Sequence, residues 1–245
     1  MRLQGWVLGS VSGLLFLLLA FASMAEEALT GPDQLLERGD IQSVREAVLH
    51  YVRAAQANEE SYEANWKCAR AHAVYANRAF QRDLDGWKGI CERYGKEGMK
   101  YGKKAIQLAP DRVEGNYYYG LCVKSYADAV SVLTALAEGL KGSTQKAFET
   151  AYKLDKMYEN GGPIKAIGRF WFVLPWPLKD RNDSLTYFEE HHKYFPEDPE
   201  GEVWYAEALI DDGRKGQAKK LLEKASHSDH AYYSKRAKGL LGENF

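Results

Sequence analysis

Apolar residues recur at intervals of three and four along most of the chain, and polar residues occupy the positions between them. This spacing is typical of amphipathic helices, and no segment shows a convincing strand-like alternation. Glycine and proline stand mainly between the periodic segments, where they end helices. The pattern predicts helices over 41–57, 61–82, 87–108, 113–139, 143–158, 163–173, 181–194, 199–211, 214–226 and 230–241.

Small residues mark a repeat within these helices. Ala105 precedes Pro110 by five positions and Gly120 follows that proline by ten, and Ala206 likewise follows Pro196 by ten. Small residues let two antiparallel helices touch, and a proline after the second helix stops it from continuing. The spacing is that of a tetratricopeptide repeat, whose period is about 34 residues.

The repeat predicts the fold class. About four and a half repeats fit the chain, stretched around 83–93 and 123–142, and 230–241 follow as a C-terminal capping helix. One helix pair buries too little surface alone, so stacked pairs form a continuous core and a curved superhelix. We predict that residues 26–245 form a single all-α domain, a tetratricopeptide-repeat-like superhelical solenoid of antiparallel helix pairs.

The first 25 residues differ from the rest. Arg2 precedes an apolar stretch from Trp6 to Ala22, and small residues follow at Ser23 and Ala25. This order is typical of a secretory signal peptide. An uncleaved membrane anchor is the alternative, since about 17 apolar residues are the lower limit for spanning a bilayer. We expect residues 1–25 to direct export to the periplasm, with membrane contact only through an uncleaved N-terminus.

Charge and cysteine content narrow the function. The 245 residues include 33 basic and 34 acidic ones, without the basic excess of nucleic-acid-binding proteins. Cys68, Cys91 and Cys122 fit no zinc or redox motif. They are either buried small apolar residues or include one disulfide, Cys68–Cys91 or Cys91–Cys122. We expect no nucleic-acid partner, no cofactor and no metal.

No catalytic constellation is recognisable in the sequence. It contains no nucleophile elbow, no phosphate-binding loop and no zinc-protease motif. Repeat scaffolds usually bind other molecules through their concave surfaces. We therefore expect a binding protein and not an enzyme.

Three segments carry a closer resemblance: VEGNYYYG at 113–120, GGPIKAIGRFWFVLPWPLKD at 161–180, and SLTYFEEHHKYFPEDPEGEVWYAEALIDDGRKGQAKKLLEKA at 184–225. They resemble the tetratricopeptide proteins grouped with the T-component of TRAP transporters, and the likeness covers most of 45–226. It implies a periplasmic accessory protein that associates with the solute-binding protein of a system carrying small organic acids. This sequence lacks the lipid-attachment cysteine of some members.

The resemblance leads us to expect an exported binding protein, accessory to a TRAP-type transport system. It would bind a protein partner, such as a periplasmic solute-binding protein, or a small organic anion on its concave face. A general envelope protein-assembly scaffold unrelated to transport is the alternative.

Lys165 and Arg169 lie four positions apart, so two positive charges share one helix face. Like charges at this spacing repel, so something negative should meet them. One hypothesis is a carboxylate from a ligand or a partner protein. The other is internal pairing with Asp155 and Glu159 on the preceding helix. Phe172 is expected on the same exposed side.

Aromatic and cationic residues on other helices extend the predicted concave surface. Tyr117 and Tyr118 belong to a run of three tyrosines that cannot all face the core, because successive helix positions point about 100° apart. Trp66 and Arg70 lie on an earlier, equivalent helix.

Trp176 stands between two prolines that hold its turn extended. It either covers a groove or packs on Trp171. The candidate binding residues are Lys165, Arg169, Phe172, Trp176, Trp66, Arg70, Tyr117 and Tyr118.

Overall fold

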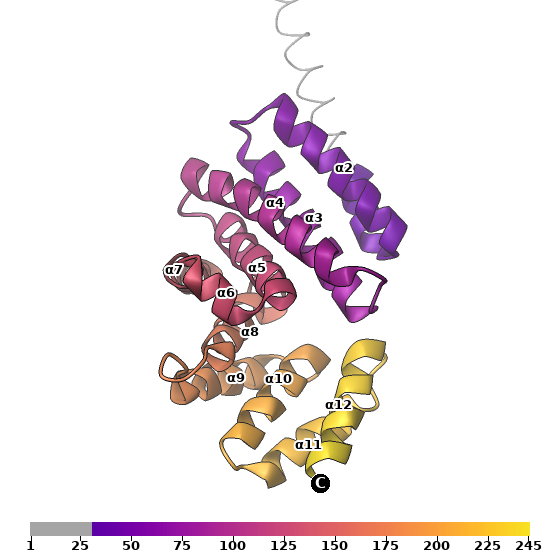
Figure 1. The fold of residues 1–245 in the computed structure, drawn as a ribbon, viewed down its shortest axis with the longest axis vertical. Helices are drawn as coiled ribbons and strands as arrows, with labels where there is room; N and C mark the ends of the chain where they lie inside the picture. Colours follow the sequence, from indigo (N-terminus) through magenta and orange to yellow (C-terminus); the bar gives the residue numbers. More distant parts are fainter. Residues whose placement is uncertain (1–30) are drawn as a thin grey trace, which may run out of the picture.

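The computed structural model describes residues 31–245, and every regular element in that range is helical (Figure 1). The helices are α2 (Ile41–Ala57), α3 (Tyr62–Gln81), α4 (Trp87–Leu108), α5 (Val113–Val130), α6 (Val132–Ala137), α7 (Leu140–Asp155), α8 (Tyr158–Val173), α9 (Arg181–Tyr194), α10 (Pro199–Asp211), α11 (Lys215–Ala225) and α12 (Ala231–Asn244). Residues 31–38 are also helical. The all-α prediction is confirmed, while the predicted signal peptide, residues 1–25, lies outside the described residues.

Successive helices pack as pairs: α3 with α4, α5 with α7, α8 with α9, and α10 with α11. The first helices of these pairs also contact one another, from α3 through α5, α8 and α10 to α12. They form one inner row, and their partners form an outer row. Within residues 31–245, no helix is both long and apolar enough to cross a bilayer.

The pair α8–α9 shows why small residues recur. A side chain at Gly168 would place its Cβ 3.1 Å from the ring of Phe188, and Ser184 donates a hydrogen bond to the Gly168 carbonyl at 3.1 Å. Ile164 and Ile167 lie fully buried beside this contact. The small residue therefore sets how closely the two helices of the pair approach.

The three cysteines are buried and carry no disulfide bond, so the first of the two alternatives is confirmed. Cys122 donates a weak hydrogen bond to the Ala69 carbonyl and Cys91 one to the Ala76 carbonyl. Burial raises the pKa of the Cys91 thiol to about 11. These thiols are packing residues between α3, α4 and α5.

The predicted continuous helix over 113–139 is wrong. It breaks at Ser131, whose φ is 110°, and the short helix α6 follows. The Ser131 hydroxyl accepts a hydrogen bond from the Thr134 amide at 3.2 Å and so caps α6. Helix α8 is also interrupted, because Glu159, Asn160 and Gly161 have positive φ angles.

The two ends of the inner row meet each other. Phe80, at the end of α3, packs against Tyr232 of α12 with ring centroids 5.6 Å apart. Beside it, the Gln81 amide donates a hydrogen bond to the Tyr233 hydroxyl at 3.2 Å. Figure 1 shows α12 next to the turn between α3 and α4. The row therefore curves far enough for its first and last helices to touch.

Candidate functional site

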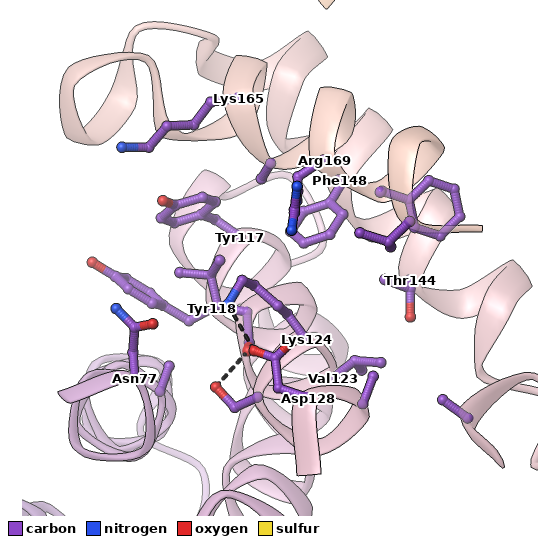
Figure 2. Close-up of a pocket in the computed structure, with 18 of the residues that line it drawn as sticks. Asn77, Tyr117, Tyr118, Val123, Lys124, Asp128, Thr144, Phe148, Lys165 and Arg169 are labelled. Carbon is purple, nitrogen blue, oxygen red and sulfur yellow. Dashed lines mark hydrogen bonds and ion pairs between the residues drawn. The ribbon is translucent and has the colours of Figure 1, made fainter. Parts of the chain in front are cut away.

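A cavity of about 340 Å³ opens on the inner row, bounded by α3, α5, α6, α7, α8 and α10 (Figure 2). Most of its lining is aliphatic or aromatic, including Leu121, Leu136, Phe148 and Phe170. Cavities of this size and character are typical ligand-binding sites in proteins. Four of the eight candidate residues line it, namely Lys165, Arg169, Tyr117 and Tyr118.

Lys165, Arg169 and Glu200 line one side of the cavity, and we call them, together with their partners Asp198 and Glu207 outside the lining, the polar wall. Lys165 Nζ lies 2.7 Å from Asp198 Oδ2 and 2.6 Å from Glu200 Oε2. Arg169 lies 2.5 Å from Glu207 Oε2. These carboxylates belong to the following pair, since Asp198 caps α10 and the glutamates lie within it.

The charges of the polar wall stabilise one another. Burial alone would lower the pKa of Lys165, but Glu200 and Asp198 hold it above its usual value. Burial would likewise raise the pKa of Glu200, yet the ion pair with Lys165 holds it at about 2. Glu207 also binds Arg236, whose Nε lies 3.0 Å away. Lys165 and Arg169 therefore have carboxylate partners within the protein.

Carboxylates of the protein itself therefore pair with both cations, as the second hypothesis expected. The particular partners predicted from the sequence, Asp155 and Glu159, are wrong. Asp155 accepts a hydrogen bond from the Met157 amide at 2.9 Å. Glu159 accepts one from the Tyr118 hydroxyl, also at 2.9 Å. Neither carboxylate pairs with Lys165 or Arg169.

The polar wall also joins the two ends of the solenoid. The Tyr233 hydroxyl donates a short hydrogen bond to Glu200 while accepting one from Gln81. A chain of polar contacts therefore runs from α3 through α12 and α10 to Lys165 on α8.

The candidate residues on α3 and α5 lie together. The rings of Trp66 and Tyr118 stack with centroids 6.0 Å apart, and the Arg70 guanidinium lies 5.1 Å from the Trp66 ring. Arg70 also forms an ion pair with Asp33. Tyr117 and Tyr118 line the cavity, whereas Trp66 and Arg70 do not.

The two remaining candidates, Phe172 and Trp176, both lie outside the cavity lining. The Phe172 ring centroid lies 5.1 Å from the Arg169 guanidinium and 4.4 Å from Lys179 Nζ, and Phe172 does not line the cavity. Trp176 is 89% exposed. The suggested packing of Trp176 on Trp171 is wrong, because a ring so exposed is not covered by a neighbour, and Trp171 packs edge-on against Phe170.

A scan against protein-family models found no match to this sequence, and a search of curated proteins found none either. Solved structures do match. TTC0263, a thermophilic TPR protein of Thermus thermophilus, aligns with a TM-score of 0.61 and 18% identity over 89% of this chain and 99% of that one. Pseudomonas aeruginosa pilF aligns with a TM-score of 0.56 and 13% identity, covering 91% and 86%. This chain folds as a tetratricopeptide-repeat-like solenoid.

In this solenoid the inner row is the concave face, and the departures from the repeat gather around the cavity. An apolar mouth lies where α6 and the end of α8 line the cavity, and of its residues only Trp176 was a candidate from the sequence. It comprises Val132, Leu136 and Val173, which line the cavity, together with Leu133 and Trp176, which lie close to this lining in the chain without being part of it. Side chains from both helices pack in one cluster with Phe170. Leu133 is 67% and Val173 37% exposed.

Backbone strain is found in the same place. Ser131 directly precedes α6, and Glu159, with φ of 49°, lines the cavity, followed by Asn160 at 53°. A positive φ in a residue other than glycine costs about 1–3 kcal/mol and is often found at binding sites. The sequence signals for this region were the stretched repeat at 123–142 and the two prolines on either side of Trp176.

Metal-binding side chains are not clustered in the described part of the chain. No group of three or more histidine, cysteine, aspartate or glutamate side chains between residues 31 and 245 could hold a metal ion.

Proposed function

We propose that this protein is a binding scaffold that holds part of a partner protein in its concave cavity. The observation that carries the proposal is the position of the two irregular segments. Helix α6 and the turn after α8 interrupt the repeat, and both expose apolar side chains at the mouth of the cavity. Insertions in solenoids often form the binding face.

The energetics favour an apolar contact over an anionic one. Burying an exposed leucine or valine side chain contributes about 1.5–3 kcal/mol, and the apolar mouth offers several. Lys165 and Arg169 already have carboxylate partners, so an anion there would compete with Asp198, Glu200 and Glu207. A protein segment with apolar side chains therefore suits the site better than a small organic anion.

For the biological context, the signal-like N-terminus and the resemblance of 161–180 support an exported protein of the periplasm. We propose that it is an accessory to a TRAP-type transport system, with the solute-binding protein as partner. A general envelope assembly scaffold is the second candidate. The identity of the captured protein separates these possibilities.

The experiment is capture of envelope proteins by three forms of the chain. A cross-linker placed at the apolar mouth is used with the wild type, Val173→Glu and the control Leu154→Glu. Val173 lines the cavity, whereas Leu154 is similarly exposed, at 41%, on α7 away from it. We expect Val173→Glu to lose a partner that Leu154→Glu retains. Equal capture by all three forms would rule out the cavity as the binding site.

A further inference from the structure

Exposed apolar side chains lie close to the cavity lining in the chain, since Leu133 directly follows Val132 and Trp176 follows Leu174 by two positions. Leu133 and Trp176 are 67% and 89% exposed, and Leu178, two positions beyond Trp176, is 41% exposed. A small molecule confined to about 340 Å³ would leave these side chains in water. A segment of a larger partner can fill the cavity and cover the surrounding apolar side chains at the same time.

The mouth also restricts the conformation of that segment. Val132, Leu133, Leu136 and Val173 present aliphatic side chains, and no sheet edge exists among residues 31–245. Asn77, Lys124 and Thr144 line the cavity and offer hydrogen bonds there, but the part of an extended peptide that covers the aliphatic mouth would leave its backbone groups without partners, at a cost of about 1–3 kcal/mol for each buried group. An α-helix satisfies its own backbone, so a helix fits this mouth.

The size of the cavity indicates how many side chains enter. A cavity of about 150 Å³ holds one benzene-sized group, so this cavity takes roughly two apolar side chains. On a helix, residues three or four apart lie side by side on one face. The entering helix therefore presents such a pair of large apolar residues.

The cations that line the cavity differ in whether a carboxylate of the chain pairs with them. Lys124 pairs with Asp128 at 2.8 Å, and Lys165 and Arg169 pair within the polar wall. Lys141 instead donates to the amide oxygen of Gln145 at 3.0 Å and lies 5.5 Å from the Trp171 ring centroid. Within the described part of the chain, no carboxylate pairs with Lys141.

We propose that the partner segment is an amphipathic helix with two neighbouring apolar residues for the cavity and an acidic residue for Lys141. This inference rests on the proposed function and names the chemistry of the partner. The acidic residue supplies the carboxylate that the chain itself provides to the other cations of the cavity.

The test uses synthetic helical peptides and the full chain. One peptide carries two leucines four positions apart and a glutamate beside them, and the matched peptide has lysine in place of that glutamate. We expect the glutamate peptide to bind about tenfold more tightly than the lysine peptide. Lys141 attracts the glutamate of the first peptide and repels the lysine of the second. Lys141→Glu should reverse this preference. The control Lys146→Glu, on an exposed lysine of α7 outside the cavity, should leave it unchanged.

A second variant tests the apolar contact. Trp176→Ala should weaken both peptides about tenfold and leave their ratio unchanged, as expected for an exposed aromatic that becomes buried on binding. The inference would be overturned if neither peptide bound, while a small apolar dye bound the cavity equally well in the wild type and in Trp176→Ala. Self-association that Trp176→Ala abolishes would also overturn it, by making a second copy the occupant.

The outcomes separate the inference from the proposed function. If Val173→Glu loses the captured partner but neither peptide binds, the helix inference fails and the binding function stands. If Lys141→Glu leaves the peptide preference unchanged, the acidic residue is excluded. If Val173→Glu captures the same proteins as wild type, the proposed function fails.

Discussion

Along α8, the polar wall changes to the apolar mouth within about two turns. In the polar wall, Lys165 and Arg169 are largely buried and paired with carboxylates of α10. At the mouth, Val173 and Trp176 are exposed without such partners. The difference separates a role in stability from a capacity to bind: charges that already have internal partners hold the solenoid together, while uncovered apolar surface is available to another molecule.

The largest expected effect tests the structural role of the polar wall. Replacing Lys165 with methionine leaves Asp198 and Glu200 partly buried without a counter-charge. Breaking a buried pair in this way costs about 3 kcal/mol or more. Urea denaturation followed by circular dichroism measures it. The control is Lys156→Met, which breaks the more exposed pair with Glu190 and should cost less than about 1 kcal/mol. Equal losses in the two variants would contradict a stabilising wall.

Acid should weaken the polar wall. The pKa of Glu200 is lowered from its ordinary value of 4.5 to about 2, because Lys165 outweighs the effect of burial. A lowered carboxyl pKa stabilises the fold above the unfolded value and loses that contribution as pH falls. About 3 kcal/mol should therefore disappear between roughly pH 5 and pH 2.

Denaturation at a series of pH values checks this prediction. Glu200→Gln should remove most of the acid-dependent loss. Glu202→Gln is the control, since burial raises the pKa of Glu202 and its titration has the opposite sign. An unchanged acid profile in Glu200→Gln would show that the pair with Lys165 does not determine it.

The contact between the ends of the solenoid should have a smaller effect. Tyr233→Phe removes the hydroxyl that joins Gln81 and Glu200. Loss of hydrogen bonds at a buried group costs about 1–3 kcal/mol. Tyr232→Phe is the matched control, because its hydroxyl forms no hydrogen bond within residues 31–245. Thermal unfolding of both variants measures the difference, and equal midpoints would show that this connection contributes nothing.

The smallest effect on stability is expected at the mouth. Trp176→Ala should change the free energy of unfolding by no more than about 0.5 kcal/mol, because its side chain is 89% exposed. Trp204→Ala, in which the ring is only 8% exposed, should cost about 3–5 kcal/mol. A large loss in Trp176→Ala would mean that this ring packs within the protein, and the mouth would not be free to bind.

The sequence predicts much of the fold because its signals are local. Four predicted helices have the same bounds in the structure, α2, α4, α9 and α10. Asp40, Asp180 and Asp198 cap three of them, and capping aspartates are readable from the sequence. The break at Ser131 was missed because a serine with positive φ gives no comparable signal.

The site was harder to predict because its interactions join distant positions. Asp198 and Glu200 lie 33 and 35 positions beyond Lys165, at the start of the first helix of the next repeat. From the sequence we predicted Asp155 and Glu159 as the partners because they are nearer in the chain. The sequence does not show how one repeat packs on the next. The charge pattern identified cations at the cavity, but the apolar mouth depends on where α6 folds.

The most direct test of the central claim compares two variants on one helix for the same partner. Arg169→Ala alters the polar wall and leaves Glu207 its second partner, Arg236, whereas Val173→Glu alters the mouth. The affinity of each for the captured partner is measured beside its free energy of unfolding. We predict that Arg169→Ala loses stability but keeps its affinity, and that Val173→Glu keeps its stability but loses affinity. The opposite result, with affinity lost only in a stable Arg169→Ala, would show that the cations bind the partner and would contradict this account.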